Sequence, residues 1–314
     1  MDNIAVLPVD GFTFPNLALM KISRYYKAQG AKVNFYNPFE YFDKLYISKI
    51  FTFSKDYEYF FTNCAEIERG GTGYDATKKL PVYIDSMQPD YTLYKNFDKN
   101  TAMGFLTRGC VNNCKWCVVP KKEGFIKAYM DIEEIAIENR NKVILMDNNI
   151  LAIDYGFEQL EKIIKLNLKV DFNQGLDARQ IDLNTAKLLA KIKWLKYIRF
   201  ACDTSNMINI CLSAIANLRA AKYNGEIFIY MLINNNLNES YERIKTFKDL
   251  KNVVPFAQPY RDFVKNIEPP QWQKDLARWA NRKQIFKTTD FKDFFARKNF
   301  CCGKYFEEFE NIKH

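Results

Sequence analysis

The pattern of apolar and polar positions predicts a βαβ unit at the start of the chain. Short apolar runs at residues 4–9 and 32–36 flank a stretch at 15–29 whose apolar residues recur with helical spacing. Gly30 follows this stretch directly, at the position where the end of a helix favours glycine. Because strand, helix, glycine and strand follow one another, we expect two parallel strands joined by a crossover helix.

Further strand-like segments complete this first module. A β-prone stretch lies at 49–53 and an apolar stretch at 59–64, ahead of the glycines at positions 70, 71 and 73. Glycines at that place suit a tight turn where two backbones approach closely. From 80 to 100 the chain is rich in Pro, Asp and Tyr without a clear period, which predicts a linker.

A more regular alternation of strand and helix patterns begins near residue 101. Strand-like runs lie at 103–106, 142–146, 168–172, 197–202, 226–233 and 252–256, with helical patterns at 131–140, 156–166, 183–192, 207–223 and 239–250. Each repeat takes roughly thirty residues, the length of a βαβ unit. The pattern predicts a parallel sheet, curled into a partial barrel or left open, with ligand-binding residues just after each strand.

These patterns together predict an α/β protein with three parts. Residues 1–100 form a Rossmann-like domain and a linker, 101–260 form the repeating βα core, and 261–314 form a C-terminal extension. Trp272, Leu276 and Trp279 share one face of a helix predicted at 271–283, so we expect the extension to pack on the core.

Composition narrows the chemistry. The only histidine among the 314 residues is His314, which excludes Ser-His-Asp and Cys-His catalysis and two-His metal sites. No apolar run is long enough to cross a membrane and the N-terminus lacks the pattern of a signal peptide, so we expect a cytoplasmic protein without a membrane partner. In that reducing compartment, eight cysteines favour a metal or catalytic site over disulfide partners.

Three cysteines follow the first strand of the core. Cys110, Cys114 and Cys117 lie on a short loop that also contains Gly109, in the spacing Cys-x-x-x-Cys-x-x-Cys. Thiolates are the ligands that iron-sulfur clusters select, and three of them leave one iron of a four-iron cluster open for another ligand. The alternatives are three free cysteines or a structural zinc site that lacks its fourth ligand.

With Trp116 directly before the third cysteine, the motif resembles that of the radical S-adenosylmethionine (radical SAM) superfamily, and the resemblance extends over residues 101–256. It implies a (β/α)6 partial TIM barrel with an iron-sulfur (4Fe-4S) cluster on Cys110, Cys114 and Cys117. It also implies that the cluster binds S-adenosyl-L-methionine and cleaves it reductively to methionine and a 5′-deoxyadenosyl radical, which takes hydrogen from a substrate. Flavodoxin or ferredoxin would supply the electron. No further catalytic residue follows from the motif.

The resemblance also places contacts to S-adenosylmethionine just after the strands. The residues at these places are Asp147, Asn148, Gln174, Asp177, Arg199, Asp203, Ser205 and Asn234. Residues 146–149 depart from the Gly-Gly-Glu-like turn of the family, so Asp147 or Asn148 would accept the methionine amino group. Arg199 has the bidentate geometry to pair with a carboxylate. Asp177 and Arg179 could equally form only a surface ion pair.

The first module resembles the cobalamin-binding-like domain of one branch of this superfamily. We expect no cobalamin, because the usual axial ligand needs an Asp-x-His motif and the only histidine is His314. Methylthiotransferase activity is disfavoured, because its second cluster needs three cysteines in this domain and only Cys64 is present. We expect no auxiliary cluster either, since the adjacent Cys301 and Cys302 cannot easily reach one iron site.

Basic and aromatic residues near the cysteine loop favour a nucleotide or RNA as substrate. Lys115, Lys121, Lys122 and Lys127 alternate with Phe125 and Tyr129 in this part of the chain, and the net charge is +9. The plainer interpretation is a solvated lysine-rich surface. Other hypotheses stay open: modification of a peptide or small metabolite by the same chemistry, a non-enzymatic iron-sulfur regulatory protein, or a plain nucleic-acid-binding protein.

Overall fold

The computed structural model describes residues 2–57, 60–261 and 267–311. The chain divides into two compact units, Met1–Ile144 and Leu145–His314, and both are of mixed α/β structure with parallel strands. The first unit therefore extends beyond the module predicted at residues 1–100, and includes the cysteine loop. Each unit is described by itself below.

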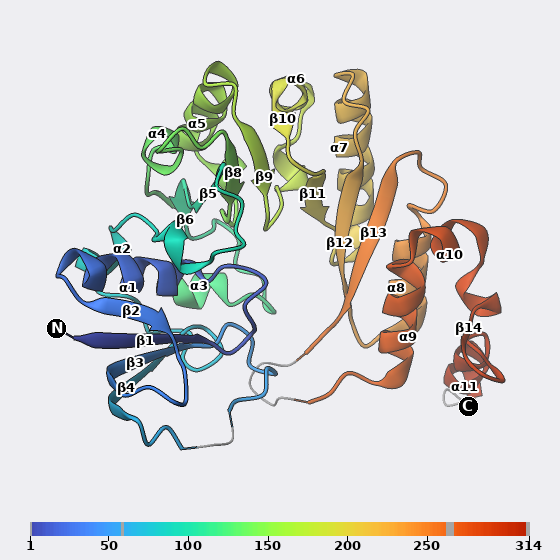
Figure 1. Cartoon of the computed structure of the whole chain (residues 1–314). Helices are drawn as coiled ribbons and strands as arrows, with labels where there is room; N and C mark the ends of the chain where they lie inside the picture. The colour runs from blue at the N-terminus through green and yellow to red at the C-terminus, as the bar shows by residue number, and fades with distance from the viewer. Residues whose placement is uncertain (1, 58–59, 262–266, 312–314) are drawn as a thin grey trace. The chain divides into compact units, whose positions relative to one another are not determined.

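A parallel sheet in the order β2-β1-β3-β4 forms the base of the first unit. Its elements are β1 (Asn3–Pro8), α1 (Leu17–Ala28), β2 (Lys32–Phe35), β3 (Phe42–Ser48) and β4 (Cys64–Gly70). Helix α1 covers one face of this sheet (Figure 1). Its N-cap is Asn16, whose side chain accepts a hydrogen bond from the backbone of Leu19, and Gly30 follows it in a left-handed conformation. The predicted βαβ unit is confirmed.

The third strand differs from its prediction. Residues 42–48 form β3, with Phe42, Leu45 and Ile47 buried against β1, whereas the predicted strand at 49–53 is a loop after the strand. The reason is that the backbone of Ile50 and Phe51 bonds to the side chain of Asp10 rather than to a neighbouring strand. The apolar stretch predicted at 59–64 begins among residues outside the described part, and β4 starts at its last residue.

The segment predicted as a linker is part of the first unit. It contains α2 (Val82–Asp85) and the 3₁₀ turn η1 (Tyr91–Leu93), and both contact α1. Asp90 is buried there and accepts hydrogen bonds from Ser23 Oγ at 2.6 Å and from Lys27 Nζ at 2.7 Å. Buried polar side chains thus hold this segment on the helix, although its sequence has no period that would show it.

Asp90 makes the stability of the first unit depend on pH. Burial acts to raise the pKa of this carboxyl, but hydrogen bonds from Lys27, Ser23 and Thr92 outweigh burial and hold the pKa at about 2. A carboxyl with a depressed folded-state pKa contributes stability above its unfolded value near 4, and the contribution is lost as the pH falls to 2. We expect roughly 2 kcal/mol to be lost between pH 5 and pH 2 in the wild type.

Urea unfolding at a series of pH values checks this expectation. In Asp90→Asn the acid-dependent part of the loss should be smaller by about that amount, because the amide does not titrate. The control is Asp2→Asn, which removes an exposed carboxyl from the same unit and tests for a general effect of losing one acidic group. Equal acid sensitivity in wild type and Asp90→Asn would contradict the assignment.

The rest of the first unit surrounds the cysteines. Its elements are β5 (Thr101–Gly104), β6 (Thr107–Arg108), α3 (Val119–Lys122), β7 (Lys127–Ala128), α4 (Ile132–Ile135) and β8 (Lys142–Leu145). The helix predicted at 131–140 is one turn only. It begins at the capping box of Asp131 and Glu134, and Glu138 and Asn139 adopt left-handed conformations that a helix cannot continue through.

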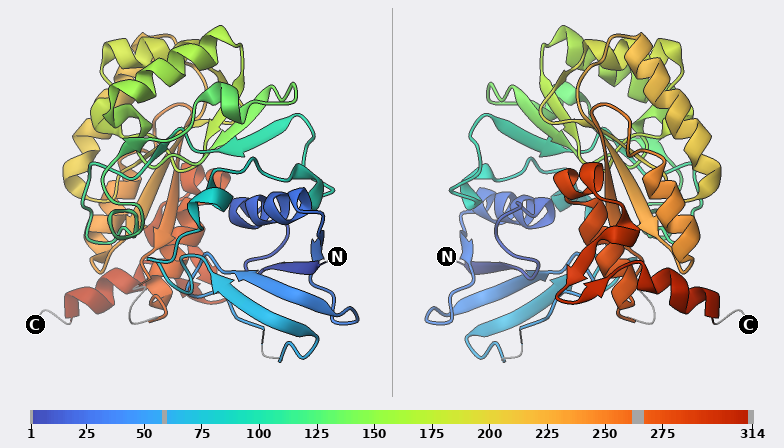
Figure 2. Two further views of the ribbon diagram at one scale, coloured as in Figure 1. Left: turned by 90° about the vertical axis from the view of Figure 1, so that its left-hand side faces the viewer. Right: turned by 90° about the vertical axis from the view of Figure 1, so that its right-hand side faces the viewer.

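The second unit follows the predicted alternation of strand and helix. Its elements are η2 (Ile150–Ala152), α5 (Asp154–Lys165), β9 (Lys169–Phe172), η3 (Ala178–Gln180), α6 (Leu183–Lys191), β10 (Lys193–Trp194), β11 (Ile198–Ala201), η4 (Ser205–Met207), α7 (Ile208–Ala220), β12 (Ile227–Ile233), α8 (Leu237–Lys245) and β13 (Val253–Pro259). Strands β11, β12 and β13 are parallel neighbours, as are β9 and β10. Helices lie along the outer side of these strands (Figure 2).

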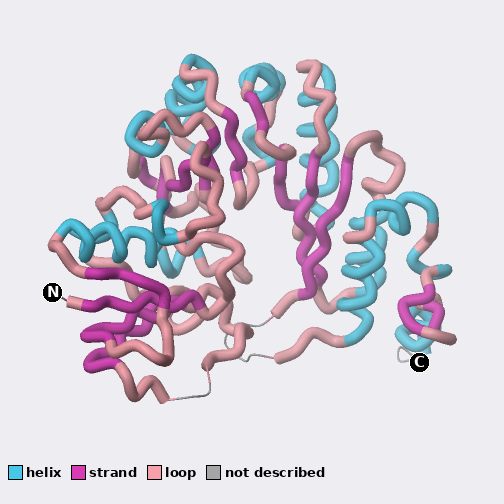
Figure 3. Tube along the Cα trace, in the orientation of Figure 1, coloured by secondary structure: helices cyan, strands magenta, loops and turns pink. Residues whose placement is uncertain are grey.

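The C-terminal segment packs on this unit. It consists of α9 (Gln271–Ala280), α10 (Lys283–Thr288), η5 (Phe291–Asp293), the hairpin β14 (Phe295–Arg297) and β15 (Phe300–Cys301), and α11 (Lys304–Asn311). Trp272, Leu276 and Trp279 are buried on α9, which contacts β13, so this prediction is confirmed. The helices of this segment are cyan in Figure 3. Within the described ranges, every helix is too short or too polar to span a bilayer.

Candidate functional site

The cysteine loop is closed by a short antiparallel hairpin. Thr107 of β6 pairs with Ala128 of β7, and Arg108 pairs with Lys127. The chain between these strands carries all three cysteines of the motif and helix α3. Because both ends of the loop are fixed to each other, its conformation is restricted even without a bound ion.

Gly109 allows the loop to leave the hairpin. Its φ is +87°, and a β-carbon at this position would lie 2.4 Å from the carbonyl oxygen of Phe125 and 2.7 Å from that of Gly124. The backbone of Cys110 donates to that Gly124 oxygen at 3.2 Å. A side chain at position 109 would therefore separate the first cysteine from the returning strand, and only glycine fits.

An ion pair joins the two sides of the same loop. Glu123 accepts hydrogen bonds from Arg108 Nε at 3.0 Å and Arg108 Nη2 at 2.9 Å, and from the backbone of Gly109 at 3.1 Å. The Glu123 side chain is 8% exposed and the Arg108 side chain 21%. The Arg108 guanidinium also lies 4.1 Å from the ring centre of Phe105. Bidentate pairing of this kind fixes direction as well as distance.

A second buried ionic group lies beside Arg108. Lys21 Nζ is 3.1 Å from both Asp85 Oδ1 and Tyr129 Oη, and Tyr129 donates to Asp85 Oδ2 at 2.9 Å. Burial lowers the pKa of Lys21, although the Asp85 carboxylate opposes this effect, and burial raises the pKa of Tyr129. Two cations, Lys21 and Arg108, and two carboxylates, Asp85 and Glu123, thus balance one another under the loop.

The three cysteines supply a donor set that fits an iron-sulfur cluster. Cys110 and Cys114 are half-buried and Cys117 is exposed. The Cys110 sulfur accepts a hydrogen bond from the backbone of Asn112 at 3.4 Å, and the Cys117 amide donates to the Cys114 oxygen in a tight turn. Backbone N–H groups directed at sulfur stabilise thiolates in such sites. In the described part of the chain, however, no three His, Cys, Asp or Glu side chains are gathered as a metal site would gather them.

Among the described residues the loop is thus closed at both ends, while its three thiols are not gathered around one point. The thiols outside the loop differ. Cys202 and Cys211 are fully buried, and a hydrogen bond with Cys202 together with burial raises the pKa of Cys211. Both cysteines pack in the core as small apolar side chains.

The residues of the second unit that are predicted to contact S-adenosylmethionine differ in burial and in their polar partners. Asp147 is buried, Asn148 is half-buried and Gln174 is exposed. Asp177 forms an ion pair with Arg179 at 2.7 Å and also accepts from Asn149 Nδ2 at 3.1 Å. Asp177 and Arg179 thus form the ion pair that was the other interpretation of these residues. The Asp177 carboxylate also joins the loops that follow β8 and β9.

Arg199 meets a carboxylate, as its predicted geometry requires, but that carboxylate belongs to the same chain. Its guanidinium pairs with Asp171, with Nη2 3.2 Å from Oδ2, and Nη1 donates to the carbonyl oxygen of Phe172 at 3.0 Å. Both charged side chains are 2% exposed. Arg199 therefore links β11 to β9, and its charge is already balanced before any ligand binds.

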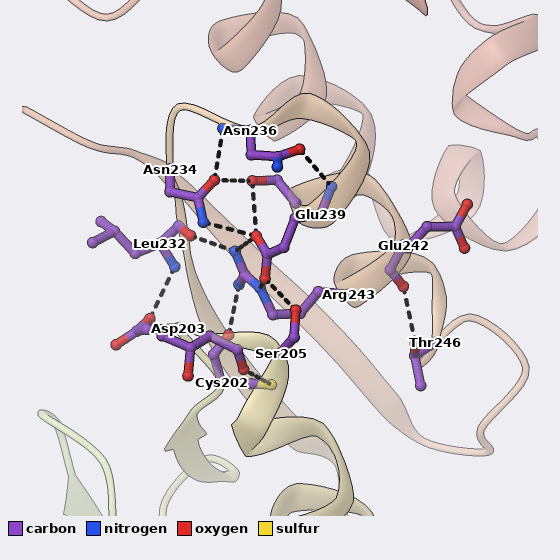
Figure 4. Close-up of polar contacts among 12 residues, drawn as sticks. Cys202, Asp203, Ser205, Leu232, Asn234, Asn236, Glu239, Glu242, Arg243 and Thr246 are labelled. Atoms are coloured by element: carbon purple, nitrogen blue, oxygen red, sulfur yellow. Dashed lines mark hydrogen bonds and ion pairs between the residues drawn. The ribbon is translucent and has the colours of Figure 1, made fainter.

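Ser205 and Asn234 are brought together by a residue that the sequence did not single out. Glu239 accepts a hydrogen bond from Ser205 Oγ at 2.7 Å and one from Asn234 Nδ2 at 2.8 Å (Figure 4). Arg243 donates from Nε to the same carboxylate at 2.8 Å. Burial acts to raise the pKa of Glu239, but hydrogen bonds from Arg243 and Ser205 outweigh it and hold the pKa below its ordinary value.

Ser205, Asn234, Glu239 and Arg243 form a group that we call the Glu239 cluster. Arg243 connects this cluster to the neighbouring strands. Its side chain is fully buried, and it donates to the carbonyl oxygens of Cys202 at 2.6 Å and Leu232 at 2.8 Å. Asp203 accepts from the backbone of Leu232 at 2.9 Å (Figure 4). The ends of β11 and β12 are thus joined by charged side chains. The four-residue spacing of Glu239 and Arg243 was the available signal for this pair.

Comparison with known proteins adds no assignment: no family model matches the sequence, and a search of curated proteins finds no match.

Proposed function

We propose that this chain is a radical SAM enzyme that binds a 4Fe-4S cluster through Cys110, Cys114 and Cys117. The observation that carries the proposal is the cysteine spacing on a loop whose two ends are closed by a hairpin and by the Arg108–Glu123 pair. In this proposal residues 101–260 form a partial (β/α)6 barrel, and residues 1–100 form a Rossmann-like domain and a linker. The parallel order of β11, β12 and β13 supports the barrel.

When bound, the cluster would supply reductive cleavage of S-adenosyl-L-methionine to a radical that abstracts hydrogen from substrate. The chain itself contributes the three thiolates and the backbone N–H group of Asn112 toward Cys110. The strand-end residues named above are proposed to hold S-adenosylmethionine, with Asp147 or Asn148 accepting its amino group. The Glu239 cluster would act on this ligand indirectly, by fixing the orientations of Ser205 and Asn234.

Anaerobic reconstitution tests the proposal. The wild type should bind about four irons per chain and develop the visible absorbance of an iron-sulfur cluster, and Cys114→Ala should lose most of both. Cys64→Ala is the matched control, because Cys64 is equally half-buried but lies in β4, outside the loop. Iron-free wild type after reconstitution, or equal loss in both variants, would reject the proposal.

A second measurement separates an enzyme from a regulatory iron-sulfur protein. With dithionite as reductant, the reconstituted wild type should form 5′-deoxyadenosine from S-adenosylmethionine, whereas a structural or sensing cluster would form none. Cluster formation without this product would remove the enzymatic part of the proposal and keep the metal site.

A further inference from the structure

The carboxyl edge of the first sheet exposes a group of large apolar side chains. These are Phe12 and Phe14 after β1, and Ile50, Phe51 and Phe53 after β3, each of them 39–50% exposed. We call this group the aromatic edge. The strand order β2-β1-β3-β4 makes the place between β1 and β3 the switch point of the sheet, where parallel α/β sheets bind ligands (Figures 1 and 3). Exposed apolar side chains gathered in this way mark interaction surfaces.

Asp10 fixes the aromatic edge. Its carboxylate accepts hydrogen bonds from the backbone of Ile50 at 2.5 Å and of Phe51 at 3.2 Å, and from Ser54 Oγ at 2.6 Å. The loop after β1 is therefore bound to the loop after β3. A surface held by three hydrogen bonds to one carboxylate is ordered before any partner arrives, which lowers the entropic cost of binding.

The rings themselves are arranged for stacking. Phe51 and Phe53 lie nearly parallel, with ring centres 5.2 Å apart and an angle of 19° between the planes. Phe12 packs edge-on against Phe35 of β2, with a centre distance of 5.0 Å. Flat rings held on a rigid edge offer faces to planar ligands, and unpaired nucleobases bind proteins in this way.

Lysines surround this edge. The glycine turn after β4 closes on the loop after β3, because the backbone of Gly73 donates to the carbonyl oxygen of Lys49 at 2.9 Å. Lys122 of α3 reaches the same turn and donates to Thr72 Oγ1 at 2.5 Å. Exposed cations on these neighbouring segments are Lys55, Lys79 and Lys121, whereas Lys78 pairs with Glu68 at 3.2 Å.

The acidic side chains near the edge are already engaged. Asp10 holds the two loops, Asp56 accepts from Lys49 and Tyr74, and Asp75 accepts from Thr77. With these carboxylates engaged and Lys55, Lys79 and Lys121 exposed, the segments offer positive charge to a partner, as a phosphate backbone requires. Since α3 begins two residues after Cys117, the hydrogen bond from Lys122 connects the glycine turn after β4 to the cysteine loop.

We propose that the aromatic edge binds single-stranded nucleic acid. Unpaired bases stack on Phe51, Phe53, Phe12 and Phe14, and the phosphates lie toward the lysines on the neighbouring turns. Exposed aromatic rings beside exposed lysines favour this partner over an apolar protein surface, for which the lysines would be unnecessary. That this nucleic acid is also the substrate rests on the proposed function; the binding itself does not.

Fluorescence anisotropy with a labelled oligoadenylate RNA tests the proposal on the full chain, both before and after reconstitution with iron. Phe51→Ala and Phe53→Ala should each weaken binding roughly 5- to 150-fold, because stacking of a base on an aromatic ring contributes about 1–3 kcal/mol. Phe39→Ala is the matched control, since Phe39 is 94% exposed but lies between β2 and β3, away from this edge. It should leave the affinity unchanged.

The salt dependence of the affinity and the comparison of single-stranded with duplex RNA provide a second readout. Replacing Lys55, Lys79 and Lys121 together by alanine should make the affinity less dependent on salt. The logarithmic slope should fall by about 0.7 for each phosphate that the variant no longer neutralises. A duplex of the same length should bind more weakly than the single strand.

Absence of RNA binding at low salt, equal loss in Phe39→Ala, or preference for the duplex would each overturn the inference, and so would self-association through this edge without RNA binding. RNA binding by protein that takes up no iron would instead reject the proposed function alone. Circular dichroism of each variant checks that the fold is retained.

Discussion

Replacing Arg243 by methionine is expected to destabilise the second unit by about 3–5 kcal/mol. The guanidinium is fully buried and pairs with Glu239, so the substitution leaves a carboxylate with no cation beside it. It also removes the donors to the carbonyl oxygens of Cys202 and Leu232, and buried acceptors without partners are costly. The ends of β11 and β12 lose their common link.

Urea unfolding followed by tryptophan fluorescence measures this effect, because Trp194, Trp272 and Trp279 all lie in the second unit. Lys245→Met is the matched control on the same helix. Lys245 is 44% exposed and its Nζ is 3.3 Å from Asp290, a surface pair that contributes only about 0–1 kcal/mol. Similar unfolding midpoints for the two variants would show that Arg243 is not a structural link.

The order of strands and helices in the second unit could be predicted because apolar periodicity is a local property. In β12 every second residue from Ile227 to Ile233 is buried, and α9 places its tryptophans on one face. The short elements around the cysteines could not be predicted in the same way. Strands β6 and β7 have two residues each, too few to show a period, and they form only because the hairpin closes.

The candidate site could likewise be predicted only in part. The spacing of Cys110, Cys114 and Cys117 indicated metal chemistry because ligand type and spacing are written in the sequence. The partners that hold the loop cannot be predicted from the sequence in this way, because Glu123 is fifteen positions from Arg108 and no periodicity connects them. Arg243 was equally hidden: a four-residue spacing from a glutamate normally describes a solvent-exposed helix pair, whereas here the arginine is buried between two strand ends.

Gly109→Ala is expected to disrupt the cysteine loop, at a cost of about 2–5 kcal/mol. A left-handed conformation costs an alanine about 1–2 kcal/mol, and the new β-carbon would lie 2.4 Å from the Phe125 oxygen, a clash that only backbone movement relieves. Such movement breaks the hydrogen bond from Cys110 to Gly124 and draws Gly109 away from Glu123. Amide hydrogen exchange between residues 107 and 128 should accelerate, and iron uptake on reconstitution should fall with it.

Gly124→Ala separates steric fit from backbone strain. Gly124 has a φ of +77°, close to that of Gly109, but a β-carbon there would meet nothing within 4 Å. This variant therefore loses only the conformational contribution, about 1–2 kcal/mol, and should keep its iron uptake. If both variants bind iron like the wild type while exchange is faster only in Gly109→Ala, the conformation of the loop does not limit metal binding. If both lose iron equally, the left-handed turn rather than the close approach to Phe125 determines the site.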